Sequence, residues 1–216
     1  MEEKHMSELE SLQVISTMIQ KAKASYHDRG TGAILWGVVV ATCSLSTWAQ
    51  LTYKYELPFD IWLLTVAAVV PTIILSIREG RRRKVKGYDE TAMNWVWTCF
   101  GISIFLTVFA SNAVGAAFGQ VKDAVEAAGG ARPAIYYSDY SSAFMLIIYG
   151  IPTLVTAGIK NFKPMLFGGI VCWLSAIAVL YTNRPTDMLL MALSATCAWL
   201  IPGIILYVKS RQQRVA

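Results

Sequence analysis

Long apolar runs alternate with short charged segments along most of the chain. Six of these runs contain 17 to 23 residues each and have no Asp, Glu, Lys, Arg or His. A helix that crosses a hydrocarbon layer of about 30 Å needs roughly 17 to 25 apolar residues. The pattern therefore predicts an all-α membrane protein with six transmembrane helices, at residues 33–51, 61–77, 93–115, 143–159, 165–181 and 188–208.

The first 32 residues follow a different pattern. Apolar side chains recur there every three or four residues, which is typical of one face of a helix, and Ser7 with Glu10 forms a capping box. The face is made of Leu9, Leu12, Ile15, Ile19 and Tyr26. We expect an amphipathic cytoplasmic helix that lies on the membrane surface, docks beneath the bundle or pairs with another protein.

Proline recurs in three of the apolar runs, at Pro71, Pro152 and Pro202. At a constant offset of 131 residues the first pair of runs matches the third without a gap. The matched pairs include Leu35 with Leu166, Gly37 with Gly168, Ser44 with Ser175 and Pro71 with Pro202. We expect three hairpin repeats, each bent at its proline. The alternative is that three spans acquired a proline independently, since proline is common in membrane helices.

The basic residues are distributed unevenly around the predicted spans. Of the 19 Lys and Arg residues, 15 lie in segments 1–32, 78–87, 160–163 and 209–216, and four lie in the opposite loops. Lys and Arg are enriched in cytoplasmic loops, so this bias places both termini in the cytoplasm. The chain then divides into a cytoplasmic helix at 1–32, a membrane domain at 33–208 and a basic tail at 209–216.

The net charge of +5 is therefore a topology signal. A basic cluster between the second and third spans is interpreted as a contact with anionic lipid. It contains Arg78, Arg81, Arg82, Arg83, Lys84 and Lys86. Such a cluster is also compatible with nucleic acid or a phosphoinositide-like headgroup, but its place in a short loop between spans favours the bilayer, and no nucleic-acid partner is expected.

Small residues spaced four apart mark where membrane helices approach closely. They occur in the first, third and fifth spans, so these odd-numbered helices are expected at the packed centre of the bundle. The sets are Ala33, Gly37 and Ala41; Ser111, Gly115 and Gly119; and Gly168, Cys172 and Ala176. The outer loop that follows the third span is expected to carry a short surface helix around "VKDAVEAA".

The residues needed for catalysis or metal binding are sparse. His5 and His27 are the two histidines, and neither has a metal-ligand partner at helical spacing. The stretch "GTGAILWG" has Leu35 at the third glycine position of a dinucleotide loop, and a helix pattern precedes it. We expect a protein that is not an enzyme and that holds no cofactor and no metal.

The stretch "ESLQVISTMIQKAK" followed by "GTGAILWG" resembles a group of uncharacterised bacterial inner-membrane proteins with an amphipathic start and several spans. The resemblance covers mainly residues 8–45 and implies a bacterial inner membrane. Two function classes follow from the sequence. The favoured one is a signalling or assembly partner, pairing with itself or another protein through the N-terminal helix. The alternative is a small-solute transporter or channel without ion coupling, since the spans have no ionisable groups.

Overall fold

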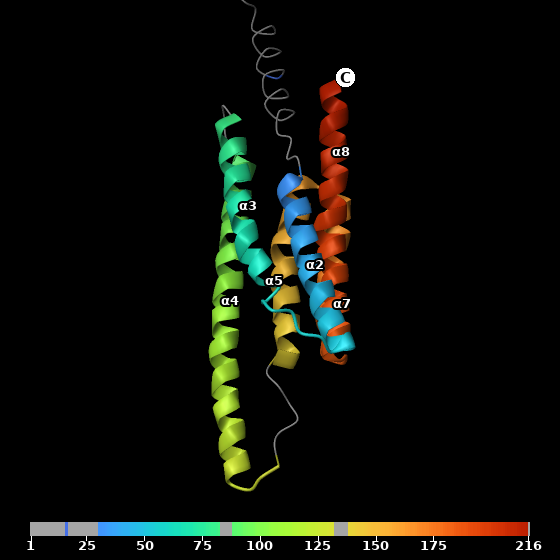
Figure 1. Cartoon of the computed structure of the whole chain (residues 1–216). Helices are drawn as coiled ribbons and strands as arrows, with labels where there is room; N and C mark the ends of the chain where they lie inside the picture. The colour runs from blue at the N-terminus through green and yellow to red at the C-terminus, as the bar shows by residue number, and fades with distance from the viewer. Residues whose placement is uncertain (1–15, 17–29, 83–87, 132–137, 216) are drawn as a thin grey trace, which may run out of the picture.

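The structure is a computed structural model that describes residues 16, 30–82, 88–131 and 138–215. These residues are helical or connecting, with no strand among them. The elements are α2 (Thr31–Tyr53), α3 (Leu63–Arg82), α4 (Tyr88–Ala127), α5 (Ser138–Lys160), α6 (Lys163–Val179), α7 (Arg184–Ala195), the π-helical turn η1 (Thr196–Leu200) and α8 (Ile201–Val215). Because α7, η1 and α8 follow one another without a break, the chain forms six rods that run alternately down and up (Figure 1).

Each of the six apolar runs falls within one of these rods. Four rods contain helices long and apolar enough to cross a membrane, with the candidate spans Thr31–Tyr53, Thr91–Ala127, Tyr140–Lys160 and Arg184–Gln212. The other two contain shorter apolar helices, Leu63–Arg78 and Lys163–Val179. The chain is thus an all-helical protein with the features of a membrane protein.

The rods divide into a compact bundle and two peripheral helices. The backbones of α2, α5, α6 and the α7–α8 rod approach one another closely, whereas α3 approaches only α2 and α4 approaches only α5 among the described elements. Ala68 of α3 is buried against Val39 and Cys43 of α2. Trp97 and Phe100 of α4 reach across to the centre of the bundle. The main core therefore lies between α2, α5, α6 and α7, with α4 covering one side.

The helix ends explain the sharp turns of the chain. After α4, Gly129 has a φ of 78°, and the Gly130 N–H donates to the Val125 carbonyl at 2.9 Å. After α5, Asn161 takes the same left-handed conformation with a φ of 48°, and the Phe162 N–H donates to the Ala157 carbonyl at 3.0 Å. Both are Schellman-type ends, which favour Gly or Asn at the left-handed position.

The helix α4 differs from its expected form in two ways. It continues for 40 residues to Ala127, so the "VKDAVEAA" stretch belongs to this helix and not to a separate surface helix. It also lies at the edge of the molecule, and a Cβ atom added at Gly115 or Gly119 would meet nothing within 4 Å. The prediction that all three odd-numbered spans form the packed centre is therefore wrong for the third, because its small residues face away from the other helices.

Candidate functional site

A π-helical turn interrupts the last rod directly before Pro202. The Ile201 N–H donates to the carbonyl of Thr196, five residues earlier, and the α-helix resumes at Ile201. Proline has no N–H and therefore leaves the carbonyl four residues before it without its usual helical donor. A wider turn at this place shifts the hydrogen-bond register just before the proline. Single π-turns inside α-helices are frequent at functional sites.

The turn carries Trp199, which is 2% exposed and lies at the centre of an aromatic cluster. Its ring centroid lies 4.8 Å from that of Tyr149 in α5. Phe100 and Trp97 of α4 follow, with ring centroids 5.9 Å and 6.4 Å from that of Trp199. Most of these pairs have the edge-to-face geometry that aromatic rings prefer. The cluster joins α4, α5 and the last rod.

A short chain of hydrogen bonds fixes the Trp199 ring. Its Nε1–H donates to the Thr153 hydroxyl at 3.0 Å, and that hydroxyl donates to the Tyr149 carbonyl at 2.7 Å. All three residues are buried. A buried indole N–H without a partner would be costly, so this bond specifies which way Trp199 points.

Two glycines hold the π-turn from opposite helices. A Cβ atom at Gly37 of α2 would lie 2.6 Å from the Leu200 nitrogen, and one at Gly168 of α6 would meet the Ala198 Cα and the Cys197 carbonyl oxygen. The contacts are with backbone atoms, which cannot rotate away as a side chain can. Close backbone approach at small residues was expected for the first and fifth spans and is confirmed there.

Hydroxyl groups line the bundle beside this cluster. Ser44, Thr156 and Ser194 are buried, and their hydroxyl oxygens have no hydrogen-bond partner among the described residues. The Cys172 thiol points to the Ser194 carbonyl at 4.0 Å. The described residues contain no group of three or more His, Cys, Asp or Glu side chains that could hold a metal ion. What this site supplies is packing and hydrogen bonding.

The three prolines singled out by the sequence lie inside helices. Pro71 is in α3, Pro152 in α5 and Pro202 in α8. The structure brings two of them to one place, since Thr153 next to Pro152 binds Trp199 of the turn that precedes Pro202. Pro71 lies apart in the peripheral α3.

The other predicted site residues lie at or beyond the edges of the described chain. Arg78 is exposed on α3, and the helix continues through Arg81 and Arg82. Three residues of the basic cluster, Arg83, Lys84 and Lys86, lie outside the described residues, as does the predicted N-terminal face of Leu9, Leu12, Ile15, Ile19 and Tyr26. The contacts predicted for them stay predictions.

The sequence analysis missed Trp199, Tyr149 and Thr153. Pro152 and Pro202 were the available signal, because each of these three residues lies within three positions of one of the two prolines. Comparisons of the chain with protein-family models, curated proteins and solved structures found no match. The function is therefore inferred from the residues of this chain.

Proposed function

We propose that the chain is a non-enzymatic protein of the bacterial inner membrane that acts as a signalling or assembly partner through its cytoplasmic N-terminal helix. Six spans would hold it in the bilayer with both termini in the cytoplasm. The partner is another protein or a second copy of the chain. The lipid bilayer is its other contact, and no nucleic acid is involved.

The observation that carries this proposal is the filled centre of the bundle. The Trp199 cluster occupies the space between α4, α5 and the last rod, and Gly37 and Gly168 bring α2 and α6 onto the backbone of the π-turn. A solute path would need this packing to open. A protein that works by contact can keep such a centre closed, and its working surface then lies outside the bundle.

The way in which the N-terminal segment joins the bundle supports the same proposal. Gly30, directly before α2, has a φ of 66°, and a Cβ atom there would meet the Gly203 carbonyl oxygen of α8. A Cβ atom at Gly203 would in turn lie 2.9 Å from the Ile34 nitrogen. The chain that leads from the N-terminal helix is thus pressed against α8 just after the π-turn. A partner bound to that helix would act on a fixed point of the bundle.

The arrangement of helix ends supports the proposed topology. The start of α2 and the ends of α3 and α8 lie at the same end of the molecule (Figure 1). Arg78 belongs to this end, as do Lys209 and Arg211 of α8. The Lys209 Nζ lies 5.8 Å from the centre of the Phe162 ring, and the Arg211 guanidinium lies 5.6 Å from that of Tyr207. Basic side chains over aromatic rings are typical of a membrane surface with anionic lipid headgroups.

The proposed repeat of three hairpins has support from local geometry. The Thr72 hydroxyl, next to Pro71, donates to the Ala68 carbonyl at 2.8 Å. The Thr153 hydroxyl, next to Pro152, makes the equivalent bond to the Tyr149 carbonyl. Pro202 is followed by Gly203 and preceded by the π-turn, so the third hairpin would be the most altered copy. Bends at the prolines are part of this proposal.

Passive transport of a small neutral solute is the second candidate. The observation that favours it is the set of buried hydroxyls without partners at Ser44, Thr156 and Ser194. Polar groups facing one another between helices could line a path for a hydroxylated solute. Flux of small polyols into liposomes that contain the purified protein would support this candidate, and flux equal to that of empty liposomes would contradict it.

Replacing Leu12, Ile15 and Ile19 together by Ser tests the partner proposal. Burying one such side chain contributes about 1.5 to 3 kcal/mol, so the triple change should abolish co-purification of the partner while the protein still inserts in the membrane. The matched control changes Gln13, Thr17 and Gln20 to Ser, because these residues lie on the polar face of the same helix. Retention of every partner by the apolar-face variant would refute the proposal.

A further inference from the structure

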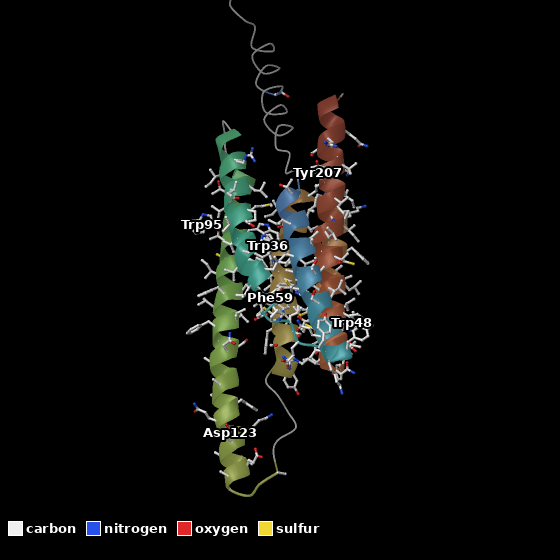
Figure 2. All side chains as sticks on the ribbon, in the orientation of Figure 1. Trp36, Trp48, Phe59, Trp95, Asp123 and Tyr207 are labelled. Atoms are coloured by element: carbon white, nitrogen blue, oxygen red, sulfur yellow. The ribbon has the colours of Figure 1, made fainter. Side chains whose placement is uncertain are left out.

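The helix α4 extends beyond the other rods at the end opposite to the basic helix ends. Figure 1 shows its last turns below the ends of α2, α5 and α7. These turns are called the outer segment of α4 and comprise residues 114–127. In Figure 2, Asp123 lies on this part of the helix, away from the bundle. In the proposed topology the outer segment projects from the outer membrane surface into water.

The outer segment continues the stripe by which α4 packs on the bundle. Trp97, Phe100 and Ile104 pack against the core higher up. The same three-or-four spacing leads through Thr107 and Ser111 to an apolar row at Val114, Phe118, Val121 and Val125. This is the heptad pattern of a helix that packs along one seam. The upper half of the stripe is covered by the bundle, and the lower half extends past it.

The lower half of the stripe is exposed. Val114, Phe118 and Val121 are 40%, 42% and 59% exposed. Gln120 and Asp123 lie on the other side of the helix, since each residue advances about 100° around the axis. The outer segment is therefore amphipathic, and an amphipathic helix in water buries its apolar stripe against a partner.

We infer that the outer segment of α4 pairs with the same segment of a second copy of this chain, in a parallel two-fold dimer. This inference rests on the topology in the proposed function. Insertion in one membrane gives every copy the same direction and depth, so the stripes of two copies meet at equal height. A row of apolar residues at heptad spacing is complementary to itself in a parallel pair.

Two features of the outer segment favour this occupant. Gly115 and Gly119 flank the stripe, and a Cβ atom at either would meet nothing within 4 Å, so the backbone of a second helix has room to approach. The formal charge of the segment is −1, from Lys122, Asp123 and Glu126. Two copies therefore repel each other only weakly, and no charged residue lies at the four positions of the apolar row.

Disulfide cross-linking in membranes tests the pairing directly. Cysteine is introduced at Val121, and a control cysteine at Gln120 lies one residue away on the polar side. Both are made with Cys99 and Cys197 changed to Ala, because Cys43 and Cys172 are buried. The dimer predicts that V121C forms a cross-linked pair of two copies and that Q120C does not. Equal yields at the two positions, or an adduct of V121C with a different protein, would overturn the inference.

A matched pair of charge changes measures the strength of the pairing. The dimer fraction is followed by energy transfer between labelled copies in liposomes over a range of protein-to-lipid ratios. Burying a Val in each of two chains predicts that Val121→Glu weakens the dimer by at least about 100-fold, while Gln120→Glu leaves it within about threefold of the unchanged chain. Equal dimer fractions for the two variants, or no dimer of the unchanged chain at any ratio, would contradict the inference.

The failure of the topology would be seen separately. The Q120C variant is treated in intact cells with a maleimide that cannot cross the membrane. Labelling from outside supports the topology, whereas labelling only after permeabilisation refutes it and removes the reason for an aqueous outer segment. The cross-linking result concerns the contact between copies, so a contact without the topology and a topology without the contact are distinguishable outcomes.

Discussion

Replacing Gly168 by Ala should destabilise the bundle through a steric contact with the π-turn. The added methyl would meet the Cys197 carbonyl oxygen and the Ala198 Cα, both in the backbone of η1. The backbone of η1 is also held from the other side, where a Cβ at Gly37 would lie 2.6 Å from the Leu200 nitrogen. The turn therefore has little freedom to move away, and α6 must shift instead.

The magnitude follows from two opposing terms. Inserting a methyl into a close-packed contact costs about 1–3 kcal/mol, whereas Gly to Ala in a helix interior contributes about 0.5–1 kcal/mol of stability. Gly158→Ala is the matched control, because Gly158 also lies in a helix and a Cβ there would meet nothing within 4 Å. The helix term is common to both changes, so the difference between the two variants isolates the steric cost of about 1–3 kcal/mol.

The assay is reversible unfolding in mixed micelles, followed by tryptophan fluorescence. Trp199 is buried beside the affected contact, so the signal reports the loss of this packing. We expect Gly158→Ala to be as stable as the unchanged chain or slightly more stable, and Gly168→Ala to be clearly less stable. If the two variants unfold within about 0.5 kcal/mol of each other, the close approach of α6 to the π-turn is wrong.

Three further changes test other parts of the structure. Thr153→Val removes the acceptor of the Trp199 indole N–H and should cost about 1–3 kcal/mol of unfolding free energy, whereas Thr72→Val, which removes only a bond within α3, should cost about 0.5 kcal/mol or less; equal costs would contradict the Trp199 bond. Gly30→Ala should cost at least about 1–2 kcal/mol because its φ is 66°, and Gly32→Ala, with nothing within 4 Å, should not; the same unfolding assay decides. Cysteines at Gln120 and Gln213 should label from opposite sides of the membrane in intact cells, and labelling from one side would refute the topology.

The sequence alone was sufficient to predict the helices and their approximate positions. Each apolar run became one rod, because a run without ionisable residues has few other stable forms. Gly37 and Gly168 were recognised as contact points from their spacing with other small residues. The length of α4 was underestimated because "VKDAVEAA" contains charged residues, which end a membrane span but not a helix.

The central site depended on packing that periodicity does not show. Pro202 indicated a disturbed helix, but the choice between a kink and a π-turn depends on the neighbours that hold Leu200 and Ala198. Trp199 and Tyr149 are apolar enough to fit any span, and the Thr153 hydroxyl that orients Trp199 comes from a helix 46 residues away in sequence. Tertiary contacts of this kind are set by three-dimensional packing, and so the sequence pattern missed them.

The measurement that tests the proposed function most directly is photo-cross-linking from the N-terminal helix in living cells. A photoreactive residue is placed at Leu12 on the apolar face and, as a control, at Gln13 on the polar face. The proposal predicts a protein adduct from position 12 that disappears when Ile15 and Ile19 are changed to Ser, and no such adduct from position 13. If position 12 forms no protein adduct while the chain is fully inserted in the membrane, the N-terminal helix is not the contact element and the proposed function is wrong.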